Sequence, residues 1–107
     1  MTRAADDVPP RPEPAAPAEP VTRTVEIINK RGLHARASAK FVQVVERFDA
    51  DVTVTRNGET VGGTSIMGLM MLAAGPGTTI EIAARGREAD AAVTALSDLI
   101  AEKFGEE

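Results

Sequence analysis

The chain has 107 residues with 12 basic and 16 acidic side chains, a single histidine and no cysteine. Without cysteine, a disulfide framework, a thiol nucleophile and a thiolate metal site are excluded, and one histidine excludes a multi-histidine metal site. We therefore expect no metal and no cofactor. The excess of acidic residues also argues against binding to nucleic acid through phosphate contacts.

Six of the seven prolines lie within the first twenty residues. Residues 1–20 mix proline, alanine and acidic residues without any apolar period, so they are predicted to form a disordered N-terminal extension. Such an extension is either dispensable or a spacer or docking segment, and we identify no motif in it that favours the second interpretation. Residues 21–107 are predicted to form one small domain.

The chain shows no pattern typical of membrane insertion. Its longest strongly apolar run, residues 65–75, is shorter than the roughly eighteen residues that cross a bilayer. The N-terminus also lacks the apolar stretch of a signal peptide. We expect a cytoplasmic monomer.

The first predicted elements are a strand and a helix. β-branched residues alternate with polar ones from Val21 to near Asn29, which is typical of a strand. Residues 30–32 then read as a turn. Apolar residues recur at helical spacing beyond it and predict an amphipathic helix over residues 35–48.

The middle of the domain is predicted to contain a hairpin and a short helix. Val52 and Val54 mark a second strand, and Asn57-Gly58 is a strong signal for a two-residue turn into a third strand, Glu59–Gly62. A brief helix is predicted at Ile66–Leu72.

The last elements are a fourth strand, Thr78–Arg85, and a closing helix. The apolar positions of that helix are Ala89, Ala92, Val93, Leu96, Leu99, Ile100 and Phe104.

The order of elements is therefore βαββαβα. Strand–helix–strand units whose strands join one antiparallel sheet need another strand between the pair, and the helices then cover one face. We predict an α/β fold of the α+β type, an open-faced two-layer sandwich with a four-stranded antiparallel sheet and three helices on one face. The other face should be solvated, as Thr22, Thr24, Thr53 and Thr55 indicate.

His34 follows the predicted turn and precedes the first helix, so its ring should lie beside the amides of the helix's first turn. The amides of Ala35, Arg36 and Ala37, the helix dipole and the Arg36 guanidinium would together suit a phosphoryl group. The same positive field favours a neutral ring with a lone pair for nucleophilic attack. On position alone, however, a histidine at a helix start is more often a cap or an ordinary surface residue.

Two motifs occur together in this sequence: residues 32–41, which read GLHARASAKF, and residues 65–70, which read SIMGLM. Together they resemble the HPr family, the histidine-containing phosphocarriers of the bacterial phosphoenolpyruvate-dependent phosphotransferase system. The resemblance covers residues 21–107, including the order of the elements.

This resemblance implies that His34 is phosphorylated at Nδ1 and that Arg36 steadies the phosphoryl group. It also makes Ser65 the serine that HPr kinase phosphorylates in lineages that possess this enzyme. One departure is Ala37, where many members that serve sugar uptake have proline. Because alanine there is similar to proteobacterial and nitrogen-branch members, the pathway branch stays open.

Residues 66–72 contain six large apolar side chains, more than a helix of two turns can bury against one sheet. Either the whole set packs in the core, with methionine as a flexible filler, or Ile66, Met67 and Met70 form a docking surface beside His34. In the second case Leu69 and Leu72 point inward. Methionine-rich surfaces re-pack against several partners, and the resemblance implies enzyme I as donor and IIA-type proteins as acceptors.

Ser65 precedes the short helix and is predicted to cap it, which by itself would explain a serine at this position. A phosphate there would also suit the helix dipole. We therefore expect phosphorylation of Ser65 to weaken docking by placing charge at the rim of the apolar surface, without unfolding the domain.

The leading hypothesis is a phosphocarrier, not an enzyme, that accepts a phosphoryl group on His34 from enzyme I and passes it to IIA-type proteins in sugar transport. The alternative is a mainly regulatory protein, acting in the nitrogen branch or in HPr kinase/phosphorylase signalling through Ser65. A third hypothesis is a structural domain whose histidine is incidental. The sequence names neither the sugar nor the acceptor.

Overall fold

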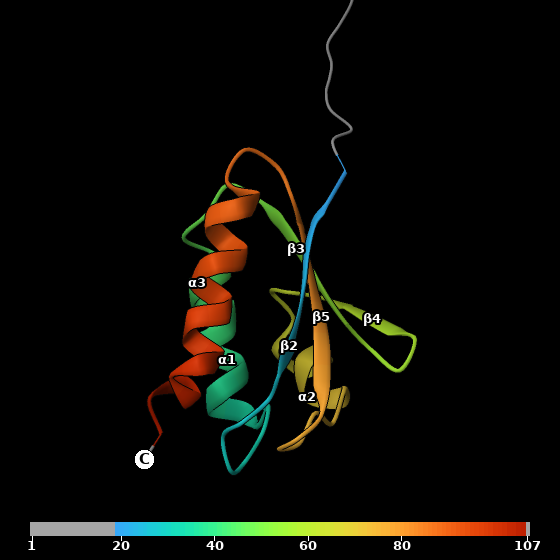
Figure 1. Cartoon of the computed structure of the whole chain (residues 1–107), viewed down its shortest axis with the longest axis vertical. Helices are drawn as coiled ribbons and strands as arrows, with labels where there is room; N and C mark the ends of the chain where they lie inside the picture. Colours follow the sequence, from blue (N-terminus) through green and yellow to red (C-terminus); the bar gives the residue numbers. More distant parts are fainter. Residues whose placement is uncertain (1–18, 107) are drawn as a thin grey trace, which may run out of the picture.

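The computed structural model describes residues 19–106, so the predicted N-terminal extension, apart from Glu19 and Pro20, lies outside the described residues. The elements are β2 (Val21–Glu26), α1 (Ala35–Val45), β3 (Asp51–Arg56), β4 (Glu59–Gly62), α2 (Ile66–Met71), β5 (Thr79–Arg85), α3 (Ala89–Ala101) and a 3₁₀ turn, η2 (Lys103–Gly105) (Figure 1). The predicted order βαββαβα is confirmed.

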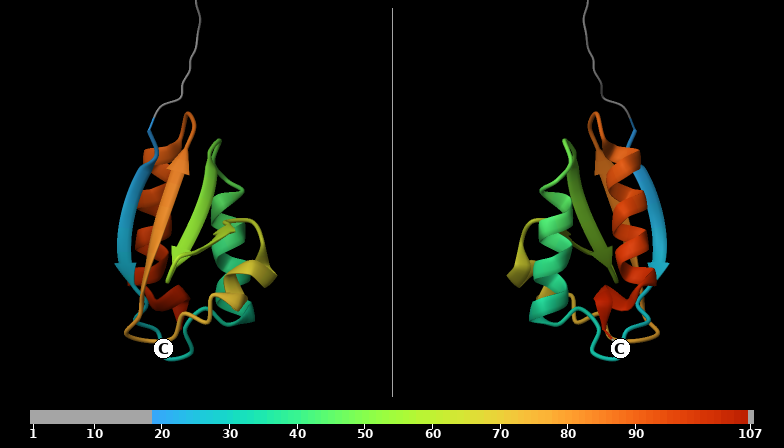
Figure 2. Two further views of the ribbon diagram at one scale, coloured as in Figure 1. Left: turned by 90° about the vertical axis from the view of Figure 1, so that its right-hand side faces the viewer. Right: turned by 90° about the vertical axis from the view of Figure 1, so that its left-hand side faces the viewer.

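The four strands form one antiparallel sheet in the order β2-β5-β3-β4. The last strand in the chain, β5, lies between β2 and β3, which is the split arrangement that the sequence predicts. Helices α1 and α3 cover one face of this sheet, and α2 packs at its end against α1 and β4 (Figure 2). The predicted two-layer α+β fold is confirmed.

Threonine lines the uncovered face of the sheet. Thr22, Thr24 and Thr53 are exposed, and the hydroxyls of Thr55 and Thr60 lie 2.7 Å apart across the β3–β4 pair. Threonine combines β-branching, which suits a strand, with a polar surface, and the cross-strand hydroxyl pair adds to the pairing. This face is solvated as predicted.

The core lies between the other face of the sheet and the helices. Its largest fully buried apolar side chains come from every layer: Ile27, Phe41, Val54, Leu69, Ile80, Ile82, Val93, Leu96 and Phe104. The register places Ile80 opposite Val25 and Ile82 opposite Val54, so neighbouring strands present their apolar residues to the same side.

The predicted hairpin is confirmed. Asn57 and Gly58 both have positive φ angles, 52° and 82°, which is the geometry of a two-residue turn between twisted antiparallel strands. The paired registers of β3 and β4 begin directly on either side of this turn, at Arg56 and Glu59.

The first strand and the first helix were both predicted to extend too far at their C-terminal ends. The first strand was expected to reach Asn29 but β2 ends at Glu26, although Ile27 still bonds to the loop before β5 through its amide and its carbonyl (both 2.8 Å). Helix α1 ends at Val45 instead of Phe48, because the amides of Arg47 and Phe48 bond three residues back and tighten the last turn.

The closing helix was also predicted to run too far. Helix α3 ends at Ala101, and Phe104 lies in η2 with a left-handed backbone. Burial explains the break: Phe104 is as fully buried as predicted, and reversal of the chain after α3 places its ring in the core. The reversal also turns Glu106 back toward the start of α1.

The turn in front of α1 makes a close contact with the loop before β5. Gly32 has a φ of +62°, and a Cβ at this position would lie 2.3 Å from the carbonyl oxygen of Ala74. The neighbouring amide of Leu33 donates to that same oxygen at 3.0 Å. Glycine is therefore required here both for its backbone conformation and for the lack of space.

We predict that Gly32→Ala destabilises the domain more than Gly58→Ala, measured by urea unfolding. Gly58 also has a positive φ, but a Cβ added there would meet no atom within 4 Å. Gly58→Ala should therefore lower the free energy of unfolding only by about 1–2 kcal/mol, the cost of a left-handed backbone for alanine. Gly32→Ala should lose about 1–3 kcal/mol more through overpacking. Equal losses in the two variants would contradict the close contact.

Candidate functional site

His34 is the residue that precedes α1. Its backbone is extended, its carbonyl accepts the first helical bond from Ser38 at 2.8 Å, and its side chain makes no capping bond. The amides of Ala35, Arg36 and Ala37 have no backbone partner within residues 19–106. His34 therefore directly precedes three amides without a backbone partner at the positive end of a helix, and the structure does not support the capping interpretation.

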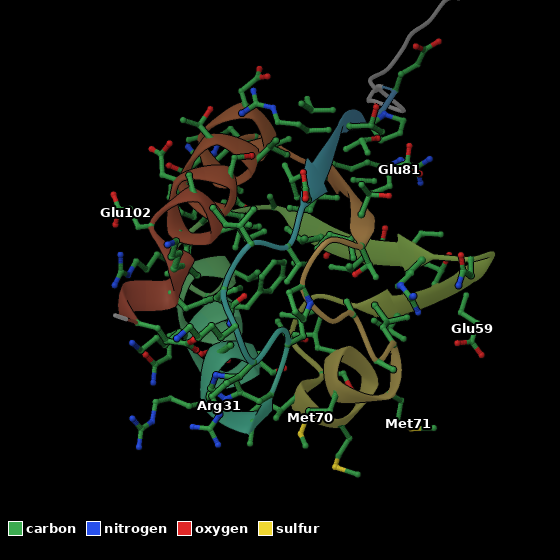
Figure 3. All side chains as sticks on the ribbon, turned by 60° about the horizontal axis from the view of Figure 1, so that its bottom comes forward. Arg31, Glu59, Met70, Met71, Glu81 and Glu102 are labelled. Carbon is green, nitrogen blue, oxygen red and sulfur yellow. The ribbon has the colours of Figure 1, made fainter. Side chains whose placement is uncertain are left out.

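A cavity of about 390 Å³ opens beside His34. Its lining residues are Lys30, Arg31, His34, Arg36, Lys40, Gly105 and Glu106. Four of these carry a positive charge and only one a negative charge. Arg31 projects from the turn before α1 at the end of the molecule that faces the viewer in Figure 3. The positive charge of the cavity therefore exceeds what the Glu106 carboxylate neutralises, which suits the binding of an additional anion.

The ring of His34 has a partner that the sequence does not predict. Its Nε2 lies 2.5 Å from Oε2 of Glu106, a residue 72 positions away in the chain. Both side chains are about four-fifths covered, with 22% of each exposed. A neutral ring in this contact carries its proton on Nε2 and leaves Nδ1 unprotonated, because a carboxylate is an acceptor only.

The carboxylate of Glu106 is held in turn by Asn29. The side-chain amide of Asn29 donates to both oxygens of Glu106 at 3.2 Å and to the backbone carbonyl of Gly32 at 2.9 Å. Asn29 is 1% exposed. From the sequence, Asn29 was predicted only to lie at the end of a strand.

The chain after α3 is folded back over α1 by two interactions. Lys103, Phe104 and Gly105 all have positive φ angles, between 56° and 78°, and the buried ring of Phe104 anchors this reversal. The Lys40 ammonium donates to the carbonyl of Phe104 at 2.6 Å. Lys40 belongs to the first motif but received no predicted role, because its partner lies 64 residues away.

The surroundings of Glu106 favour its ionised form. The hydrogen bond with His34 lowers the pKa of Glu106 below its ordinary value of 4.5, and the hydrogen bond with the Asn29 amide and the electrostatic influence of His34 and Arg31 act in the same direction. Partial burial opposes them by raising that pKa. The carboxylate is therefore charged while it contacts the ring at neutral pH.

The short helix α2 carries an exposed apolar surface, which we call the α2 patch. It consists of Ile66 (40% exposed), Met67 (67%), Met70 (38%) and Met71 (73%), whereas Leu69 and Leu72 are buried. Of the two alternatives, packing of the whole set in the core is wrong, and Ile66, Met67 and Met70 are exposed; Met71, which was not among the predicted docking residues, is the most exposed of the set. Figure 3 shows Met70 and Met71 at the same end of the molecule as Arg31. Exposed apolar side chains grouped in this way are typical of interaction surfaces.

Both ends of α2 are fixed by side chains. The hydroxyl of Ser65 accepts from the Gly68 amide at 2.9 Å, so the predicted cap is confirmed. At the other end, the Arg56 guanidinium donates to the carbonyl of Leu72 at 3.0 Å. Ser65 itself is exposed and directly precedes the α2 patch.

In the part of the chain that the structure describes, no group of three or more acidic or imidazole side chains is placed to hold a metal ion. Within the same residues, every helix is too short or too polar to cross a membrane.

Comparison with known proteins identifies close relatives over most of the chain. Residues 21–102 match the protein family described as "PTS HPr component phosphorylation site". The chain is 55% identical to "Phosphocarrier protein HPr" of Neisseria meningitidis over 84 residues, which cover 78% of this chain and 94% of that protein. It is also 42% identical over 84 residues to "Phosphocarrier protein NPr" of Shewanella violacea, covering 78% and 92% of the two chains.

The fold of this chain is also similar to that of a solved structure. The crystal structure of HPr from Thermoanaerobacter tengcongensis is similar to this one with a TM-score of 0.78 and 42% sequence identity, over 81% of this chain and 98% of that chain.

We predict that the contact between Glu106 and His34 is lost in acid. Because the pKa of Glu106 is lowered in the folded protein, the contact should be fully present above pH 4.5 and should disappear as the pH falls through the lowered value. A titration of the Glu106 side-chain carboxyl carbon by ¹³C NMR would measure this midpoint. His34→Ala removes the largest cause and should raise the midpoint, whereas a midpoint at or above 4.5 in the unsubstituted chain would contradict the contact.

Proposed function

The chain belongs to the HPr family of phosphotransferase-system proteins, and on that premise we propose that it carries a phosphoryl group on His34. The family assignment makes it a phosphocarrier of this system. The proposal concerns which atom accepts the phosphoryl group, which proteins give and take it, and how the transfer is regulated.

One observation carries the proposal: the only histidine of the chain borders a cavity lined by four cationic side chains and directly precedes the first, unbonded amides of a helix. A phosphoryl group adds a charge of about −1.5 to −2. Amides, a partial dipole charge and the Arg36 guanidinium can stabilise that charge, and Arg36 lies two residues beyond His34 on α1. We propose that Ala35, Arg36 and Ala37 supply the amides.

The contact with Glu106 supports Nδ1 as the attacking atom. With its proton on Nε2, the ring presents the Nδ1 lone pair to the phosphorus of the donor. The bond from that phosphorus to the donor breaks as the new phosphorus–nitrogen bond forms, and its electron pair returns to the donor. The phosphorylated ring keeps its Nε2 proton and gains a positive charge, which faces the Glu106 carboxylate. Transfer to an acceptor is the reverse of this step.

We propose enzyme I as the donor and IIA-type proteins as acceptors, with the α2 patch as the docking surface for both. The patch is apolar, exposed and rich in methionine, so it can re-pack against partners of different shape. Helix α2 packs against α1, whose first residue follows His34, so a partner bound on α2 lies next to the histidine.

A second, mainly regulatory function is favoured by two observations. One is the 42% identity to a relative named NPr rather than HPr, which supports a role in the nitrogen branch. The other is the exposed position of Ser65 beside the α2 patch, which supports regulation by an HPr kinase/phosphorylase. Both functions use the same carrier site.

We predict that incubation with phosphoenolpyruvate, Mg²⁺ and enzyme I places acid-labile phosphate on the unsubstituted chain and none on His34→Ala. Arg36→Ala should retain the modification but accept it about tenfold more slowly, because one charge-assisted contact is lost. Ser65→Ala is the control and should be labelled to the same extent as the unsubstituted chain. Label that persists in His34→Ala would contradict the proposal.

We predict that Ser65→Asp slows phosphoryl transfer from enzyme I, because it puts charge at the rim of the α2 patch. Its thermal stability should be retained, since aspartate is also a good helix cap. Ser65→Ala separates the two roles: it should lose about 1 kcal/mol of stability with the cap and leave transfer unchanged. An unchanged rate with Ser65→Asp would contradict regulation at this position.

A further inference from the structure

Asn29 occupies a buried position between the turn that precedes His34 and the end of the described chain. Its side-chain nitrogen has two hydrogens, and the structure gives each a partner: the Gly32 carbonyl and the Glu106 carboxylate. Its side-chain oxygen is buried and has no partner among the described residues. The side chain thus acts here as a donor only.

The chemistry of the site determines which way this amide faces. Turned over, the amide would bring its oxygen against a carbonyl and a carboxylate, which are both acceptors. Aspartate would create the same repulsion, and glutamine is one methylene longer at a position that is 1% exposed. Asparagine therefore fits this site where its closest chemical relatives do not.

The two partners of Asn29 are the two groups that hold His34. Gly32 accepts a hydrogen bond from the His34 backbone amide at 2.9 Å, and Glu106 contacts the ring at Nε2. A single buried amide thus fixes both the backbone partner and the ring partner of the same histidine.

We propose that Asn29 is a positioning residue for phosphoryl transfer, which holds the Glu106 carboxylate against Nε2 of His34 and so keeps the lone pair on Nδ1. This inference rests on the proposed function of His34. It assigns Asn29 no contact with the phosphoryl group; its effect is transmitted through Glu106.

The first test is spectroscopic and needs no phosphoryl donor. In alkaline buffer, where the ring is neutral, its ¹⁵N chemical shifts report which nitrogen carries the proton. The unsubstituted full-length chain should show the proton almost entirely on Nε2, whereas Asn29→Ala and Glu106→Ala should both show a mixture of the two tautomers. Ser38→Ala is the matched control, because Ser38 is also fully buried and bonds to the same turn, at the Leu33 carbonyl, but does not contact Glu106.

Ser38→Ala should keep the tautomer of the unsubstituted chain. A mixture in this control as well would show that any disturbance of the turn shifts the ring, and would overturn the specific role of Asn29. A ring unchanged by Asn29→Ala would overturn it too. If Asn29→Ala does not fold, Glu106→Ala tests the contact through which Asn29 acts, because its substitution lies on a partly exposed side chain. A tautomer unchanged by Glu106→Ala would overturn the proposal.

The second test is a double-substitution cycle on the rate of phosphoryl transfer from enzyme I. Asn29→Ala and Glu106→Ala should each lower the rate about tenfold, the effect of losing a hydrogen bond to a charged group. If Asn29 acts through Glu106, the double variant should be within about twofold of Glu106→Ala alone, whereas independent effects would multiply to about a hundredfold. The multiplied result would overturn the proposal.

The two tests separate this inference from the proposed function. A chain that takes no phosphoryl group on His34 refutes the proposed function, and with it any role of Asn29 in transfer. A chain that is phosphorylated on His34 but keeps its Nε2 tautomer in Asn29→Ala retains the proposed function and refutes the positioning role.

Discussion

The position of His34 depends on the close contact between two loops. The turn before α1 passes so near the loop before β5 that only a glycine, Gly32, fits against the Ala74 carbonyl. That contact fixes the backbone immediately before the histidine, and the histidine directly precedes α1, which contributes Arg36 and Lys40 to the lining of the cavity. The central position of β5 in the sheet brings the two loops together, so the site depends on the sheet topology as well as on the local turn.

The charge of the site is opposite to that of the whole chain. The protein has a net charge of −4, yet four cationic side chains surround the cavity beside His34. A local positive field in an acidic protein attracts anionic groups to one place, whereas the rest of the surface repels them. Such a field changes the association rate of an anionic partner more than its affinity. Glu106 is the exception inside this field, and it contacts the ring at Nε2, which leaves Nδ1 without that partner.

Local interactions made most of the fold predictable from the sequence. The Asn57-Gly58 turn, the Ser65 cap and the alternation in β3 and β5 depend on residues within a few positions of one another. The predicted end of α3 was wrong, because tertiary packing decided it. Phe104 lies outside the helix, where its ring is buried in the core. Local propensity does not predict a left-handed backbone conformation for phenylalanine.

Only the part of the candidate site that is local in sequence could be predicted. His34, Arg36 and the three amides are neighbours in sequence, so position and motif were enough to group them. Asn29, Lys40 and Glu106 are joined by contacts that span 64 to 77 residues and exist only after the chain folds back past α3. No local sequence pattern around Asn29 or Glu106 predicts that the two side chains are in contact in the folded chain.

In the proposed transfer, the unpredicted carboxylate matters because a carrier has to be a good nucleophile and a good leaving group in turn. Accepting the phosphoryl group requires a lone pair on Nδ1, which the contact at Nε2 provides. Releasing it is easier when the ring leaves as a neutral imidazole, and that requires the phosphorylated ring to be cationic. A carboxylate at Nε2 favours that cation, whereas the positive end of the α1 dipole opposes it. The histidine therefore lies between two opposing fields, and their balance keeps the phosphoryl bond transferable in both directions.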